Sequence, residues 1–368
     1  MLTELEALII LSSIPQLGSV KIRTLVQQFG SAVNALEASP EQIAALPDFG
    51  PKTTKGLNEW RSNNSWKKNI ELAERHQANI ISYTHPLYPK RLLEIPDFPI
   101  LLYIKGEFIP ADQRCIAVVG TRQASIYGLD MAERISQDLA NMGFTVVSGL
   151  ARGIDTAAHV GALRRGRTVA VIGSGLADVY PKENLALAQA IAERGVLMSE
   201  FPMETPPDRQ NFPQRNRIVS GMTMATLLIE APIKSGAMIT MEKAFAYKRK
   251  LFAMPGRVDN DDFRGNHLLI KSGRAILIES AKDIVASFEN LFGLVEEFSP
   301  AKRMSTTHLN DEELELYTKL PIQESSIDQI MQLTKLPVMK INVLLMGLVM
   351  KKVVREFPGK IYKKVNKG

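Results

Sequence analysis

Seven short apolar runs alternate with longer helical segments between Cys115 and about Val285, and this alternation constrains the fold more than any other feature. The runs are CIAVVG, FTVVSG, TVAVIG, GVLMSE, ATLLIEA, KLFAMPG and RAILIES. Nearly continuous Val, Ile and Leu indicate strands that are buried on both faces, which is typical of a parallel sheet. Because crossovers between parallel strands are right-handed, the pattern predicts an α/β fold with a Rossmann-like, doubly wound parallel sheet over residues 113–287.

The segments before the predicted sheet are of two kinds. Residues 1–75 predict a helical module in which two stretches, IPQLGSVKIRTLVQQF and LPDFGPKTTKGLNEW, share an apolar residue, a glycine turn and a helix. Such a turn leaves backbone N–H groups free to bind a phosphate. The module is therefore either SAM-like or helix–hairpin–helix-like, with a role in DNA binding, or a plain helical bundle. Residues 76–112 contain five prolines and predict a short strand followed by an extended connector.

The segments after the predicted sheet are a linker over residues 288–305 and a winged-helix domain over 306–368. Three short helical patterns are followed there by two strand-like runs around Pro358-Gly359. The last 18 residues carry seven Lys or Arg against one acid. Three roles are open for this domain: contact with DNA through a basic wing, docking of a protein partner, or structural capping.

Composition excludes several functional classes. A single cysteine, Cys115, excludes an internal disulfide, and no two of the five histidines have the spacing of metal ligands. We therefore expect no metal site. No apolar stretch reaches the ~20 residues that span a bilayer, and the first residues lack a secretory pattern. These features predict a cytoplasmic protein with no membrane partner, and the net charge of +6 permits a polyanionic one.

The loops that follow the strands form the predicted binding surface, because ligands bind beyond the carboxyl ends of an open parallel sheet. Gly120-Thr121-Arg122 follow the first strand; the glycine admits a ligand to the backbone, and the arginine offers a forked cation for phosphate. The alternative is a tight turn with a solvated arginine. Asp155 and His159 lie four residues apart on one predicted helix, and we favour structural roles for them over a catalytic dyad.

A long segment after the fourth strand, SEFPMETPPDRQNFPQRNRIVSG, is rich in proline and has no helical period. It predicts a functional loop of some twenty residues. Three arginines alternate with an aromatic ring within it, which suits single-stranded nucleic acid: the arginines follow the phosphates and the ring stacks on a base. In the alternative interpretation, Phe212 only pins the loop to the core.

Sequence signals for catalysis are weak. Asp178 stands where the third glycine of a dinucleotide motif would follow Gly173-Ser174-Gly175, and the chain has no G-x-x-x-x-G-K-[ST] loop. No set of nucleophile, base and acid is recognisable. The surface is therefore expected to hold phosphates rather than to break bonds, without a cofactor.

Seven motifs occur in a fixed order, and together they resemble DNA-processing protein A, the DprA/Smf family. They are VVGTRQASIYG, VSGLARGIDTAAH, GSGLADVYPKEN, SEFP, NFPQRNRIVSG, EAPIKSGAMIT and MPGRVDN. The resemblance implies a non-catalytic, homodimeric protein that binds single-stranded DNA, protects incoming strands and loads the RecA recombinase during natural transformation, without ATP of its own. Thr121 stands where serine is common in the family.

The family's binding positions match Arg122, Lys182, Arg209 and Phe212, and its R-N-R run matches residues 215–217. Together with the loop analysis, the resemblance gives the residues that we expect to contact DNA: Gly120, Thr121, Arg122, Lys182, Arg209, Phe212, Arg215, Asn216, Arg217, Ser235 and Gly236. Two other functions are open: an enzyme that acts on a nucleotide or sugar phosphate in the same pocket, and a regulator that binds double-stranded DNA through the winged helix.

Overall fold

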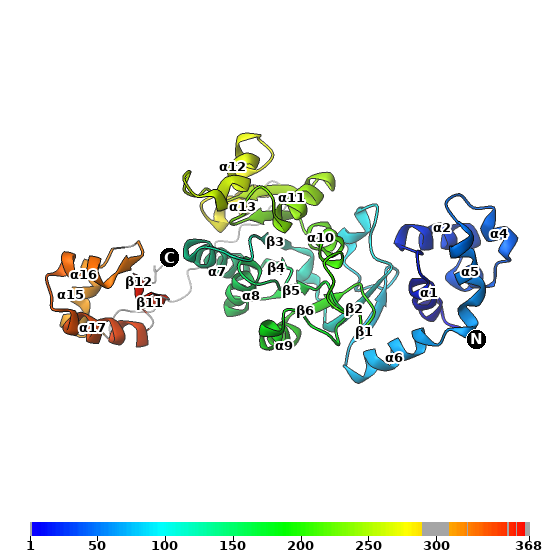
Figure 1. The fold of residues 1–368 in the computed structure, drawn as a ribbon, viewed down its shortest axis with the longest axis horizontal. Helices are drawn as coiled ribbons and strands as arrows, with labels where there is room; N and C mark the ends of the chain where they lie inside the picture. Colours follow the sequence, from blue (N-terminus) through cyan, green and yellow to red (C-terminus); the bar gives the residue numbers. More distant parts are fainter. Residues whose placement is uncertain (1, 289–308, 322, 352, 358, 365–368) are drawn as a thin grey trace. The chain divides into compact units, whose positions relative to one another are not determined.

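The computed structural model describes residues 2–288, 309–321, 323–351, 353–357 and 359–364 (Figure 1). The chain forms two compact units, Met1–Val295 and Glu296–Gly368. Apart from residue 288, the predicted linker lies outside the described residues.

A sheet of nine strands forms the centre of the larger unit, with the order β1-β2-β6-β5-β4-β3-β7-β8-β9. All strands from β6 to β9 in this order pair in parallel. They are β3 (Cys115–Val119), β4 (Thr145–Ser148), β5 (Thr168–Val171), β6 (Val196–Ser199), β7 (Ala225–Leu228), β8 (Lys250–Ala253) and β9 (Ile276–Leu277). The predicted mixed α/β fold with a mostly parallel sheet is confirmed.

One edge of the sheet departs from the prediction. β2 (Leu101–Gly106) pairs antiparallel with β6, and β1 (Asn79–Ser82) pairs antiparallel with β2. The predicted connector therefore contributes two strands instead of one. Its prolines lie outside both strands, where they remove no ladder hydrogen bond. Two short 3-10 turns, η2 (Lys90–Glu94) and η3 (Pro110–Gln113), flank β2 in the chain.

Helices cover both faces of the sheet, as Figure 1 shows. Along β3, Ile116 and Val118 pack into one apolar cluster, whereas Ala117 and Val119 pack into another. The first face carries α7 (Ile126–Asn141), α8 (Ile154–Arg165) and α9 (Leu185–Arg194), and the second carries α10 (Asn211–Gly221) and α11 (Gly236–Ala246). Two shorter helices follow: α12 (Arg264–Lys271) and α13 (Ala281–Ala286).

The order of the strands reverses at β3. The chain moves from β3 through β4 and β5 to β6, then returns to place β7 on the other side of β3 and continues outward. The loops after β3 and β7 therefore diverge to opposite faces and leave a crevice at their carboxyl ends. This is the position where doubly wound sheets bind ligands.

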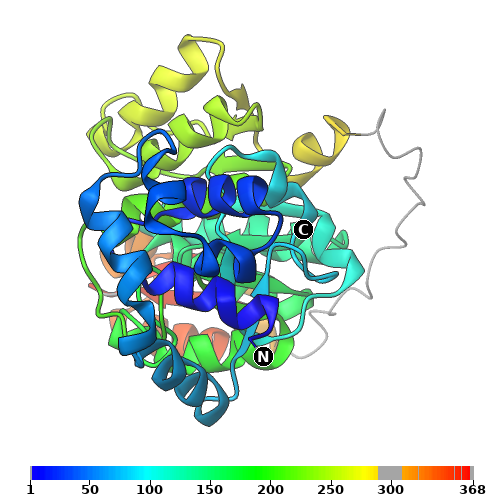
Figure 2. The ribbon, with the colours of Figure 1, turned by 90° about the vertical axis from the view of Figure 1, so that its right-hand side faces the viewer.

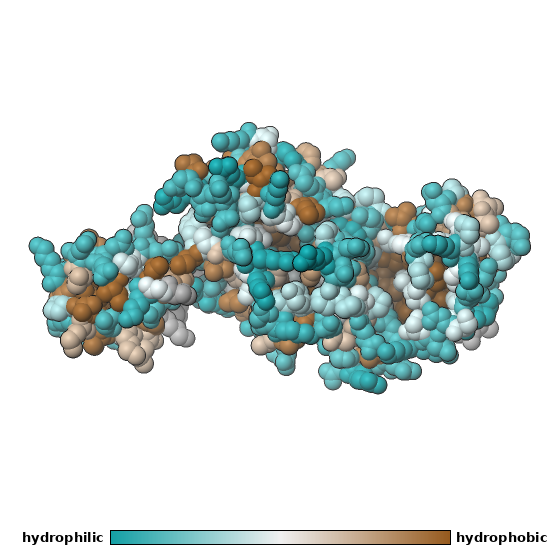
Figure 3. All heavy atoms as spheres, in the orientation of Figure 1, coloured by the Kyte–Doolittle hydropathy of each residue, from teal (hydrophilic) through white to brown (hydrophobic). Residues whose placement is uncertain are grey.

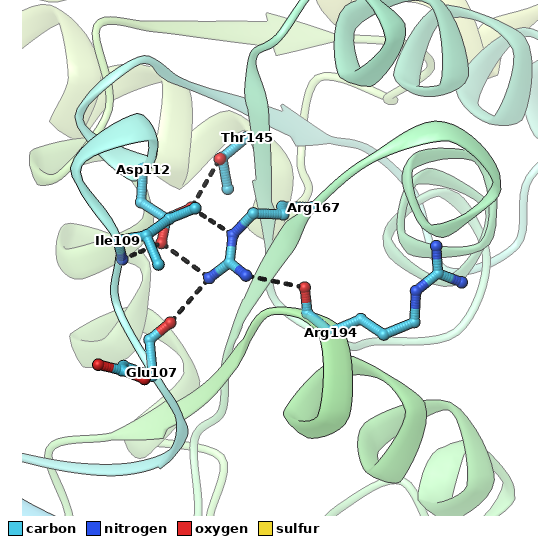
Figure 4. A network of polar contacts seen from close by, with 6 residues as sticks. All are labelled: Glu107, Ile109, Asp112, Thr145, Arg167 and Arg194. Carbon is cyan, nitrogen blue, oxygen red and sulfur yellow. Dashed lines mark hydrogen bonds and ion pairs between the residues drawn. The ribbon is translucent and has the colours of Figure 1, made fainter.

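At the amino ends of the parallel strands, buried Asp112 of η3 forms an ion pair with half-buried Arg167, which directly precedes β5 (Figure 4). Both Asp112 oxygens accept from Arg167, each at 3.0 Å, and one also accepts from Thr145 Oγ1 at 2.8 Å. Arg167 further donates to the backbone carbonyls of Glu107 and Arg194. This network joins the segment before β3 to β4 and β5.

Six helices precede the sheet and appear in blue in Figures 1 and 2. They are α1 (Glu4–Ser13), α2 (Ser19–Phe29), α3 (Ala32–Glu37), α4 (Pro40–Ala44), α5 (Pro51–Glu59) and α6 (Ser65–Arg75). Gly18 and Gly50 are the N-caps of α2 and α5, and neither helix has a side-chain cap. Asn69 of α6 joins the sheet, because its side chain donates to the Tyr103 hydroxyl at 2.5 Å and accepts from Met203 N at 2.8 Å.

The described residues of the smaller unit form three helices and a three-stranded antiparallel sheet with the order β10-β12-β11. In chain order the elements are α15 (Asp311–Lys319), β10 (Ser325–Ser326), α16 (Ile327–Thr334), α17 (Val338–Met350), β11 (Val354–Phe357) and β12 (Ile361–Lys364). Within the described ranges no single helix has both the length and the apolar composition to cross a bilayer; the bent pair α16–α17 passes that test only when its two helices are taken together.

Candidate nucleic-acid interface

A pocket of about 710 Å³ lies at the crevice beside β3. Loops after β3, β4, β6 and β7 contribute to it. Nine of the residues predicted to contact DNA line this pocket: Gly120, Thr121, Arg122, Arg209, Phe212, Arg215, Asn216, Ser235 and Gly236. The structure thus brings together residues that lie more than a hundred positions apart in the sequence.

The loop that carries Arg122 is fixed by Glu230, which follows β7. The Glu230 backbone carbonyl accepts from Thr121 N at 2.7 Å, and its carboxylate accepts from the Ser125 backbone N–H at 3.0 Å and hydroxyl at 2.6 Å. Burial raises the pKa of Glu230, and the hydrogen bonds from Ser125 oppose that rise. The exposed Arg122 side chain therefore projects from a well-anchored turn.

The loop after β4 packs directly on the first loop. Gly153 has φ +75°, and a Cβ at this position would lie 2.4 Å from the Thr121 carbonyl oxygen. Ile154 N donates to the same oxygen at 3.2 Å. Only glycine satisfies both the positive φ and the close approach, so this position fixes the distance between the two loops.

The long segment after β6 is not a loop throughout, which corrects the prediction. The helix α10 begins at Asn211 and contains Phe212, Arg215 and Arg217. Pro213 lies in the first turn of α10, where a missing N–H costs no helical hydrogen bond, so a proline there does not prevent a helix. Among the predicted cations of this segment, Arg209 remains in the loop.

Arg215 is buried rather than exposed along a DNA path, with 3% of its surface accessible. Its Nη1 donates to the carbonyl of Gly149 at 2.5 Å and to that of Val171, and it thereby ties α10 to the ends of β4 and β5. A Cβ at Gly149 would lie 2.3 Å from this nitrogen. Burial lowers the pKa of Arg215 to about 10, which leaves a positive charge beneath the pocket at neutral pH.

Arg217 and Lys182 do not line this pocket. Residues 215 and 217 face different sides of α10, so Arg217 does not reach the pocket. It is buried and forms an ion pair with Glu200. Lys182 is exposed and lies 2.5 Å from the Asp178 carboxylate. Asp178, which stands where the third glycine of a dinucleotide-binding motif would be, thus forms an ion pair with Lys182.

Two side chains pack near the Phe212 ring. The Arg122 guanidinium lies 5.1 Å from the centre of the Phe212 ring, and the Tyr180 ring lies 5.9 Å from it. Phe212 also packs on Gly173, where a Cβ would lie 2.9 Å from the ring. Tyr180 was not among the residues predicted to contact DNA; it is 37% exposed and lines a small neighbouring pocket of about 50 Å³. The signal available was an aromatic residue in a loop after a strand.

The start of α11 forms the opposite wall. The Ser235 hydroxyl caps the helix by accepting from Met238 N at 3.3 Å, and Asn216 donates to the Gly236 carbonyl at 3.2 Å. No atom lies within 4 Å of the position that a Cβ on Gly236 would take, so the backbone here is open to a ligand. Backbone N–H groups and the helix dipole favour an anion at this point.

Asp155 and His159 are both buried. The Asp155 carboxylate accepts from Gly149 N at 3.1 Å and Ala151 N at 3.3 Å. His159 Nδ1 lies 2.7 Å from the Thr168 hydroxyl, and burial lowers the pKa of His159 to about 3. Each side chain therefore bonds to a different partner near the ends of β4 and β5.

The charge of the pocket suits an anion. Its charged lining residues are one buried acid and five cations: Asp155, Arg122, Arg152, Arg209, Arg215 and Lys234. Arg152 and Lys234 were not among the residues predicted to contact DNA. The lining contains no cysteine or histidine, and in the described parts of the chain no three His, Cys, Asp or Glu side chains gather in a way that could hold a metal ion. This arrangement is suited to binding phosphates.

A family model described as DNA recombination-mediator protein A matches residues 79–289, which is more than half of the chain. The chain belongs to this family. The resemblance that the sequence motifs indicated is thereby confirmed. The matched residues of the DNA recombination-mediator protein A family include the whole nine-stranded sheet and every lining residue of the pocket.

Similar proteins come from several bacteria. Protein Smf of Synechocystis is 36% identical over 281 residues, 75% of this chain and 70% of that protein. Protein Smf of Escherichia coli is 39% identical over 234 residues, and the alignment spans 62% of its length. DNA processing protein DprA of Streptococcus pneumoniae is 42% identical over 203 residues, 55% of this chain and 71% of that protein.

Two solved structures of the family are similar to this fold. The X-ray structure of DNA processing protein A from Streptococcus pneumoniae has a TM-score of 0.68 and 33% identity, and it covers 78% of this chain and 99% of that one. A structure of the Helicobacter pylori protein, described by its single-stranded DNA binding mode, has a TM-score of 0.53 and 28% identity, and covers 58% of this chain and 96% of that one.

Proposed function

We propose that this protein is a non-catalytic single-stranded DNA-binding protein that acts in DNA processing. The observation that carries the proposal is the pocket at the strand-order reversal, where five cations and the open start of α11 surround a space of about 710 Å³. The Helicobacter pylori relative, whose structure is described by single-stranded DNA binding, supports the same ligand.

The positions of the pocket residues suggest a different role in DNA binding for each group of them. Exposed Arg122 and Arg209 contact phosphates, and the backbone at Gly120, Thr121, Ser235 and Gly236 accommodates a phosphate between the loops. Buried Arg215 supplies positive potential from beneath, and Asn216 holds α10 against α11. Phe212 and Tyr180 present rings to the bases. Lys182 and Arg217 lie outside the pocket, so we expect them to contribute less than Arg122.

The finer parts of the proposal rest on family membership. We propose that the protein is a cytoplasmic homodimer that protects incoming single strands and loads RecA onto them during natural transformation. The smaller unit has the element order of a winged helix, and the glycine-capped starts of α2 and α5 are consistent with a helix–hairpin–helix-like or SAM-like module.

The proposal is tested by binding of fluorescent oligothymidine to the full chain at several salt concentrations. If about four phosphates are contacted, log K falls with log salt at a slope near −3. Arg122→Ala should weaken binding by about 1.5–3 kcal/mol and reduce the slope by ~0.7. The matched control is Arg165→Ala, since Arg165 is exposed at the far end of α8.

Two results would contradict the proposal. The first is an Arg122→Ala variant whose affinity for oligothymidine equals that of Arg165→Ala. The second is a mononucleotide that binds as tightly as the oligonucleotide, because that result would favour an enzyme acting on a small phosphate ligand.

A further inference from the structure

A second pocket, here called the η2–η3 pocket, has a volume of about 340 Å³ and lies at the amino ends of the parallel strands. Its walls come from the chain around η2 and η3, which precede β2 and β3, and from Met222 at the end of α10. Eight of its thirteen lining residues are proline, methionine, aliphatic or aromatic, and none of them lines the pocket at the carboxyl ends of the strands. An apolar concavity of this size with a few polar groups is typical of a ligand site.

Two cations of the η2–η3 pocket have no acid partner in the described parts of the chain. They are Lys90 and Arg91, and the buried Arg91 Nε also has no hydrogen-bond acceptor there. The two acids of the lining are already bonded, because Glu94 lies 2.5 Å from Arg249 and Asp112 belongs to the network of Figure 4. The pocket therefore has a positive charge that a bound anion would balance, and the anion would supply the acceptor that Arg91 lacks.

Exposed apolar side chains do not by themselves mark a binding site. They also gather over α15 and α17 of the smaller unit in Figure 3, where the neighbouring Lys340 and Lys351 form ion pairs with Glu312 and Glu313. The η2–η3 pocket differs from that surface because its apolar walls surround cations that are unpaired in the described residues. Unpaired cations between apolar walls suit a carboxylate that is attached to an apolar group.

The exposed rim of the η2–η3 pocket indicates a ligand that extends beyond the cavity. Leu87 and Ile109 line the pocket, yet 41% and 37% of their surfaces are exposed. A small molecule inside would leave both side chains in water, whereas a protein segment that crosses the pocket covers them. Tyr88 and Phe108 are almost fully buried, so they offer no ring face on which a nucleic-acid base could stack. We therefore infer that the pocket binds a segment of another protein in which Asp or Glu stands next to an apolar residue.

The test measures the binding of fluorescent peptides to the full chain by anisotropy. The probe is a short peptide with Phe-Glu-Leu at its centre and Gly and Ser elsewhere; one comparison peptide has Gln in place of Glu, and another has Ser in place of both apolar residues. The probe should bind about tenfold more tightly than either comparison peptide. Arg91→Gln should weaken binding of the probe about tenfold and Lys90→Gln about threefold, whereas the control Lys52→Gln, at an exposed position of α5 outside the pocket, should not. Because Lys90 is exposed, its variant tests the site even if Arg91→Gln does not fold.

Several outcomes would overturn the inference. Equal binding of the Glu and Gln peptides would show that the cations take no part, and binding of none of the peptides would remove the protein segment. Lys90→Gln and Arg91→Gln variants that bind the probe as tightly as Lys52→Gln does would place the peptide elsewhere. Displacement of the probe by an equal concentration of octanoate or of oligothymidine would assign the pocket to a small apolar acid or to nucleic acid. Oligothymidine binding itself should be unchanged in Lys90→Gln, so the inference and the proposed function fail separately.

Discussion

At the scale of single residues, the pocket combines exposed side chains that meet a ligand with buried ones that hold the loops. Arg122 and Tyr180 are exposed and lie near the Phe212 ring, whereas Arg215 is buried. The sequence pattern identified Arg215 as a cation but not as a buried one, because burial depends on the helix α10 and on two carbonyls far away in the chain. The positive charge of Arg215 could therefore be predicted from the sequence, but its burial and its hydrogen-bond partners could not.

The rings of Phe212 and Tyr180 should contribute to the binding of bases rather than phosphates. Either change to alanine should cost about 1–3 kcal/mol in binding oligothymidine, because base–ring stacking is lost. Neither should change the affinity for an abasic oligonucleotide of equal length. Tyr127→Ala is the control, since Tyr127 is also 37% exposed and lies 6.0 Å from another phenylalanine, Phe263, outside the pocket. Equal losses of affinity for oligothymidine and for the abasic oligonucleotide would show that the two rings only stabilise the pocket and do not stack on bases.

His159 should make stability depend on pH. Its pKa is lowered from 6.5 to about 3 by burial, so the unfolded chain binds a proton below pH 6.5 and the folded chain does not. The stabilisation from the neutral ring is therefore complete above pH 6.5 and is lost as pH falls toward 3, by at most ~1.4 kcal/mol per pH unit.

The measurement compares the free energy of unfolding of the natural chain and of His159→Gln in urea between pH 7 and pH 5. The natural chain should lose stability more steeply as pH falls. Asp155 and Glu230 have raised pKa values and act in the opposite direction, but they are present in both proteins and cancel in the comparison. Parallel pH profiles would show that His159 does not titrate in this way.

At the scale of elements, the two ends of the parallel strands differ. The carboxyl ends border an open, cationic pocket, whereas the amino ends are joined by the network of Asp112 and Arg167 (Figure 4). Asp112→Ala should reduce the free energy of unfolding of the larger unit by about 3 kcal/mol, because the arginine loses its buried partner. Arg61→Ala, which breaks an exposed pair with Glu37, should cost less than about 1 kcal/mol. Similar losses in both variants would contradict this account.

Elements were predictable where one signal dominated. The seven apolar runs each became a strand. Burial on both faces explains the first six, because it leaves a nearly continuous hydrophobic sequence, whereas Ile276 and Leu277 of β9 are exposed at the end of the sheet. Two elements were not predictable in this way. The start of α10 was not predicted because Pro213 indicates a loop, although proline is compatible with the first turn of a helix. The position of β2 was not predicted because it pairs with β6, a strand about ninety residues later in the chain. Pairing over such distances depends on tertiary context.

At the scale of the whole molecule, the larger unit contains the pocket, which lies where the strand order reverses. The functional proposal depends on the crevice, and the strand order predicts the location of the crevice without reference to any relative.

The most direct measurement of the central proposal is a crystal structure of the protein with bound oligothymidine. We expect phosphates beside Arg122 and the start of α11 at Gly236, with a base near Tyr180. An empty crevice with the oligonucleotide bound elsewhere on the protein would contradict the account.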